Sequence, residues 1–147
     1  MKKVIIALAI VLVLIQFYRP AKNQHPGLSV NAIETHYDVP EKVAALLRTS
    51  CYDCHSNNTK YPWYNNIQPV AFWLNSHVND GKKHLNFDEF NSYTKERKTK
   101  KLKEIAETIE NGEMPLSSYT LIHGNAKLTA ADKQVLIDWA RNQADAL

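Results

Sequence analysis

The two cysteines of this 147-residue chain stand three residues apart and are followed at once by a histidine, in Cys51-Tyr52-Asp53-Cys54-His55. Two cysteines are too few for a disulfide-rich scaffold, an iron–sulfur cluster or a four-cysteine zinc site. In a helical turn, residues i, i+3 and i+4 share one face, so the two thiols and the imidazole can converge on a single flat ligand. The C-x-x-C-H spacing is the attachment pattern of c-type haem, and it favours a fold that wraps this group.

The motif predicts one covalently bound haem c, attached as thioethers through Cys51 and Cys54, with His55 as the proximal ligand of the iron. Other interpretations of the same residues stay open. A thioredoxin-like redox pair needs a βαβ context that the sequence lacks, and a zinc site needs two further ligands. The remaining alternative is a structural disulfide between the two cysteines.

Met114 is the candidate for the distal haem ligand. Apart from the initiator it is the only methionine, and it lies in a loop where Pro115 restricts the backbone. A thioether ligand raises the reduction potential of a haem, whereas the alternative is a methionine that only fills a gap in the core. The competing ligands are three histidines that follow the motif, His77, His84 and His123. His25 and His36 are less favoured, because they precede the motif in linker-like sequence.

The N-terminus has the pattern of a membrane anchor or an export signal. Two lysines precede an unbroken run of 12 apolar residues, Val4 to Ile15. This length matches the roughly 7–15 apolar residues of a secretory signal and is short for a full span, which needs about 17–25. No small-x-small cleavage site follows, and Phe17 and Tyr18 suit a membrane interface. We expect an uncleaved anchor in a bacterial inner membrane with the domain in the periplasm; the alternative is release to the periplasm after cleavage.

The charge of the chain is concentrated at its N-terminus. The formal net charge is +3, but residues 1–24 carry four bases and no acid, so residues 25–147 sum to −1. Nucleic-acid binding has no support from this distribution. The expected partners are therefore the membrane and redox proteins. We divide the chain into residues 1–24, the signal or anchor with the start of a linker, and residues 25–147, the haem-binding domain.

The rest of the sequence has helical periodicity and no alternation typical of strands, which predicts an all-α fold. We expect a linker over 19–32, a helix from Pro40 to about Thr49 and an irregular loop over 56–69. A short helix should run from Val70 to Val78 and be ended by Asn79-Asp80-Gly81, and another should open in 95–103 and end at Asn111-Gly112. The last helix has Thr129 as its N-cap, and Asp132 completes a capping box. Aromatic residues gather after the motif and on the last helix, where they could shield a haem from water: Tyr61, Trp63, Tyr64, Phe72, Trp73 and Trp139.

Several segments resemble a family of bacterial haem-binding domains, which are small cytochrome-c-like proteins with an N-terminal hydrophobic segment. The matching residues are SCYDCHSNNTKYPWY from Ser50 to Tyr64, then Gly81, Asn86-Phe87, Met114-Pro115, and Leu128-Thr129 to Trp139. The resemblance spans roughly residues 33–145, with Phe90 where tryptophan is expected.

The resemblance implies a cytochrome-c-like helical domain around one covalent haem, with Cys51 and Cys54 attached, His55 proximal and Met114 as the matching methionine. We expect a carrier of single electrons rather than a catalyst. The alternative is a haem-based sensor or a peroxidase-like enzyme with an open sixth site.

Overall fold

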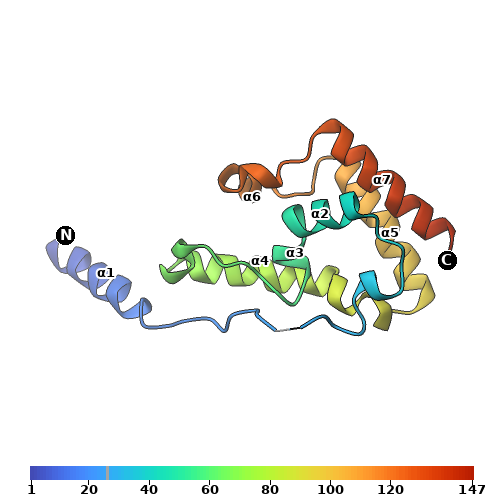
Figure 1. Ribbon diagram of the computed structural model, residues 1–147. Helices are drawn as coiled ribbons and strands as arrows, with labels where there is room; N and C mark the ends of the chain where they lie inside the picture. Colours follow the sequence, from blue (N-terminus) through green and yellow to red (C-terminus); the bar gives the residue numbers. More distant parts are fainter. Residues whose placement is uncertain (26) are drawn as a thin grey trace.

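The computed structural model describes residues 1–25 and 27–147, and within them the chain is built from helices (Figure 1). The α-helices are α1 (Lys2–Ile15), α2 (Glu41–Ser50), α3 (Tyr52–His55), α4 (Val70–His84), α5 (Lys95–Glu110), α6 (Ser117–Ile122) and α7 (Ala130–Asp145). Short 3₁₀ helices lie between them: η1 (Ile33–Thr35), η2 (Trp63–Asn66), η3 (Phe87–Ser92) and η4 (Gly124–Ala126). The described residues contain no β-strand, only an isolated bridge between Gln24 and Asn58. The all-α prediction is confirmed.

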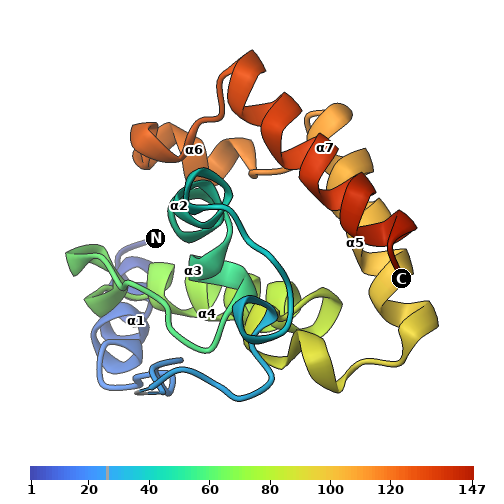
Figure 2. The same ribbon diagram turned by 45° about the vertical axis from the view of Figure 1, so that its right-hand side comes forward.

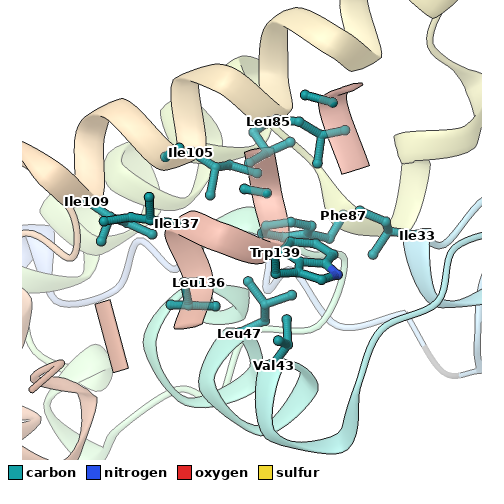
Figure 3. Close-up of a cluster of buried hydrophobic side chains, with 14 of the residues drawn as sticks. Ile33, Val43, Leu47, Leu85, Phe87, Ile105, Ile109, Leu136, Ile137 and Trp139 are labelled. Carbon is teal, nitrogen blue, oxygen red and sulfur yellow. The ribbon is translucent and has the colours of Figure 1, made fainter. Parts of the chain in front are cut away.

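The core lies where α2, α5 and α7 meet the segment around η3. Helices α5 and α7 run side by side along their length (Figures 1 and 2), and α2 packs against α7. Leu47, Leu102 and Leu136 are fully buried there, and each such side chain contributes about 1.5–3 kcal/mol by leaving water. Trp139 lies in the same cluster (Figure 3), where its indole N–H donates to the Asp38 carbonyl at 3.1 Å. This core supports the C-terminal end of α2, directly before the C-x-x-C-H motif.

Three predicted helices begin and end close to where their sequence signals lie. Helix α2 starts one residue after Pro40. Helix α5 ends at Glu110, and Gly112 beyond it adopts φ +74°, the left-handed conformation that favours glycine at a helix end. Helix α7 has the full capping box, in which the Thr129 hydroxyl accepts from the Asp132 N–H and the Asp132 carboxylate accepts from the Thr129 N–H. These predictions are confirmed.

The predicted end of the helix after Val70 is wrong. Helix α4 continues through Asn79, Asp80 and Gly81 and ends at His84. A Cβ at Gly81 would lie only 2.5 Å from the Cys54 carbonyl oxygen, so this glycine allows α4 to pass close to α3. Tertiary packing therefore overrides the weak helix propensity of glycine.

The N-terminal apolar run forms α1, and most of its side chains are exposed. No helix in the described part of the chain has both the length and the apolar character needed to cross a membrane. The expected linker over 19–32 includes residue 26, which lies outside the described residues. Its neighbours contact the domain: the His25 N–H donates to the Asn57 carbonyl, and the Thr59 N–H donates to the Asn23 carbonyl. Part of the expected linker is therefore hydrogen-bonded to the domain.

Replacing Gly81 with alanine tests the close approach of α3 and α4. We expect Gly81→Ala to destabilise the protein by about 1–3 kcal/mol, because the new methyl group meets backbone atoms that cannot move aside. Gly124→Ala is the matched control, since a Cβ there meets no atom within 4 Å and the change should stay within about 0.5 kcal/mol. Urea unfolding of both variants measures the difference, and equal stability would contradict the packing.

Candidate functional site

The C-x-x-C-H motif forms a single helical turn at the end of α2. The backbone bends at Cys51, and the N–H groups of Cys54 and His55 both donate to the Cys51 carbonyl, at 3.2 and 3.0 Å. This is the turn that the spacing of the motif predicts, with the two thiols and the imidazole placed at i, i+3 and i+4. Helix α4 packs against the turn and fixes its position.

The imidazole of His55 is oriented by a backbone carbonyl. Its Nδ1 lies 3.0 Å from the Leu85 carbonyl oxygen, and because a carbonyl can only accept, Nδ1 carries the proton. The Nε2 lone pair is then available to a metal, the arrangement in which protein carbonyls commonly hold ligating histidines. Burial lowers the pKa of His55, which favours the neutral ring that can bind iron, although hydrogen bonds to the Leu85 and Gly81 carbonyls act in the opposite direction.

Two adjoining cavities lie beside this turn, with about 610 and 710 Å³ of empty space including their open mouths. Cys51, His55 and Met114 line both cavities, and Cys54 lines the larger one. The structure therefore brings together all four predicted site residues, although Met114 comes from the loop between α5 and α6, 59 residues after His55.

The two thiols are free in the structure and half-buried. Burial, followed by the neighbouring Cys54, raises the pKa of Cys51 to about 12. Burial, followed by the Asp53 carboxylate, raises the pKa of Cys54 to about 11. Redox-active C-x-x-C pairs need a lowered thiol pKa, so these values speak against a thioredoxin-like thiolate. Among the described residues no group of three or more His, Cys, Asp or Glu side chains could hold a metal ion, and the zinc alternative gains no support.

A family model described as a haem-binding domain matches residues 10–142, most of the chain. The chain belongs to this haem-binding family. No curated protein and no solved structure matched the chain. The match begins within α1, so the family pattern includes the C-terminal part of the apolar helix together with the domain.

A third cavity of this haem-binding domain, of about 560 Å³ including its open mouth, also has Cys54 in its wall, and we call it the aromatic cavity. Tyr61, Tyr64 and Trp73 line it, in agreement with the expectation that aromatic rings gather near the motif. Trp63 differs, because it is 76% exposed and lines none of these three cavities. Phe72 is also exposed, and Trp139 belongs to the core between α2 and α7 (Figure 3).

The histidines that compete for the distal position separate by location. His84 lines both cavities at the motif, and His77 lines the larger one. His123 lines the aromatic cavity, where its Nε2 lies 3.4 Å from the Tyr64 hydroxyl. His25 and His36 line none of these three cavities. His84 is therefore the strongest rival of Met114.

Sequence reasoning missed the role of Asp53, which lies between the two cysteines of the motif. Its carboxylate accepts from the Tyr119 hydroxyl at 2.7 Å and from the Lys60 N–H at 3.0 Å. Burial and this carboxylate raise the pKa of Tyr119. Tyr52, its neighbour in the motif, packs its ring on Phe87 at 5.2 Å between centroids. No local signal marks these roles, because the partners lie far away in the sequence.

The donor set and the cavities fit a c-type haem. Two thiols for thioether bonds, an imidazole with a free Nε2 and a thioether sulfur all line adjoining spaces. Lys101 and Glu104 form a 2.6 Å ion pair on the wall of the smaller cavity, so that wall also carries charge.

The Tyr119–Asp53 hydrogen bond should couple α6 to the motif. We expect Tyr119→Phe to cost about 1.5–3 kcal/mol, the range for a hydrogen bond to a charged group. Asp53→Asn keeps an oxygen for the Lys60 N–H and weakens the acceptor for Tyr119, so the double variant should be less destabilised than the sum of the two single variants. Urea unfolding of the four proteins measures this coupling, and strictly additive costs would contradict it.

Proposed function

We propose that the chain is a membrane-anchored, periplasmic monohaem c-type cytochrome domain that transfers single electrons. The observation that carries this proposal is the meeting of Cys51, Cys54, His55 and Met114 at two adjoining cavities. Local sequence brings the first three together, but only the fold brings Met114 to them. The family membership supports haem binding itself.

Each site residue has a distinct role in the proposal. Cys51 and Cys54 attach the haem as thioethers, and His55 presents Nε2 to the iron while the Leu85 carbonyl holds the ring. Met114 provides the distal sulfur from the loop after α5. A bound haem supplies one-electron exchange at its iron. Two protein ligands leave no open position for a substrate, which is why the proposal is a carrier rather than an enzyme.

The anchor in this proposal is α1 with its two preceding lysines. Its side chains from Val4 to Leu14 are exposed and all apolar, so they need a cover other than water. A lipid bilayer provides that cover, and the bacterial inner membrane with the domain in the periplasm is the location that haem c attachment suggests. An intact mass of the purified protein distinguishes retention of α1 from cleavage and release.

Expression with a cytochrome c maturation system tests covalent attachment. We expect the haem to stay with the protein in acid–acetone, because two thioether bonds hold it. In the Cys51→Ala/Cys54→Ala variant the haem should be extracted, and the intact mass should lose the mass of one haem. Wild-type protein that carries no covalent haem would overturn the proposal and favour a haem-free disulfide module.

Replacement of Met114 tests the distal ligand. We expect Met114→Ala to abolish the methionine–iron charge-transfer band, to lower the reduction potential and to allow carbon monoxide to bind the reduced protein quickly. His84→Ala is the matched control, since His84 lines the same two cavities and its loss should leave the band intact. A band that survives Met114→Ala but not His84→Ala would contradict the assignment. Rapid carbon monoxide binding by wild-type protein would favour a sensor or enzyme.

A further inference from the structure

Large apolar side chains are exposed together at one end of the molecule. They come from η2 and the residue after it, the start of α4 and the end of α6, and we call this surface the apolar end: Trp63, Ile67, Phe72, Trp73, Leu121 and Ile122. Leu121 is 85% exposed and Trp63 is 76% exposed. In both views α6 and the first half of α4 lie at the end of the molecule nearest α1 (Figures 1 and 2). Such a group of side chains indicates an interaction surface.

The apolar helix α1 is attached to this same end. The Gln16 side chain accepts from the Gln68 N–H at 3.0 Å and donates to the Gln68 carbonyl at 3.2 Å. The Gln68 side chain donates to the Tyr18 carbonyl at 2.8 Å. The Tyr18 ring stacks on Phe72 with 4.9 Å between centroids. The exposed apolar surface of α1 and the apolar end therefore belong to one connected region.

Basic residues lie beside this region. Lys22 lies over the Tyr61 ring at 5.8 Å from its centroid, and Lys60 lines the aromatic cavity together with Trp73 and Ile122. Asp53 also lines that cavity, with its carboxylate bonded to Tyr119 and to the Lys60 N–H. The Arg19 guanidinium donates to the Asn66 carbonyl, which places a positive charge beside η2. Basic residues beside exposed tryptophans suit the headgroup layer of an anionic bilayer.

We infer that the apolar end lies in the interface of an anionic lipid bilayer, next to α1, so that the domain sits on the membrane in one fixed orientation. The inference rests on the proposed membrane anchoring and adds which surface of the domain contacts lipid. Trp73 and Ile122 belong both to the apolar end and to the wall of the aromatic cavity beside Cys54. This cavity consequently opens beside the membrane surface, whereas the far ends of α5 and α7 face the aqueous phase.

Spin labelling of the full-length haem protein in vesicles tests this orientation. Leu121→Cys and Trp63→Cys introduce label sites in the apolar end, and Asn142→Cys places the control on the exposed surface of α7. Vesicles contain phosphatidylcholine with or without phosphatidylglycerol. The measured quantity is the ratio of the label's collision rate with oxygen to its collision rate with a water-soluble nickel chelate. This ratio should be several-fold higher at positions 121 and 63 than at position 142. This contrast should weaken several-fold without phosphatidylglycerol, because the basic residues lose their counter-charge.

The possible failures point to different causes. Vesicle-bound protein in which positions 121 and 63 are as open to the nickel chelate as position 142 would overturn the inference and leave the anchor intact. Protein that does not sediment with vesicles would overturn the anchoring itself. Spin–spin broadening at position 121 without vesicles would show a second copy on the apolar end and overturn the lipid assignment. Mass spectrometry checks for one label per chain, and two further labels would show free Cys51 and Cys54, a failure of the haem proposal alone.

Discussion

The close approach of α4 to the C-x-x-C-H turn is the contact on which the site depends. Gly81 leaves no side chain between α4 and the Cys54 backbone, and Leu85, the residue directly after this helix, accepts from His55 Nδ1 through its carbonyl at 3.0 Å. A larger residue at position 81 would push the turn away and break that hydrogen bond. The imidazole would then lose the contact that selects its tautomer and aims Nε2. The packing of α4 against α3 therefore also determines how His55 is oriented toward a metal.

Local signals in the sequence predicted the elements whose ends depend on local chemistry. The capping box at Thr129 and Asp132 and the left-handed Gly112 act within a few residues, and both mark helix ends correctly. Gly81 misled the prediction for α4, since its purpose is a contact with Cys54, 27 residues earlier in the chain. Helix α6 has only six residues and no side-chain cap, so the sequence gives little sign of it.

The candidate site also has a part that local sequence encodes and a part that depends on tertiary packing. The motif itself encodes the helical turn of Cys51, Cys54 and His55, because these residues are neighbours in the chain. The meeting of Met114 with the turn depends on how α5 packs against α7 and leads into its loop, which no local pattern states. The hydrogen bond of Asp53 could not be predicted for the same reason, because its partner Tyr119 lies 66 residues away. Local sequence therefore identifies the first half of the site, and tertiary packing completes it.

The contacts of Gln68 bear on whether α1 remains part of the mature protein. Gln68 is only 2% exposed, and its polar atoms are satisfied by Gln16 and Tyr18 from the N-terminal segment, as well as by the Phe72 N–H. Cleavage before Arg19 would remove Gln16 and Tyr18 and leave Gln68 with the Phe72 N–H alone among these partners, a loss of about 1–3 kcal/mol if water does not replace the others. It would also uncover the face of Phe72 on which Tyr18 stacks. These contacts support the proposal that α1 is retained in the mature protein.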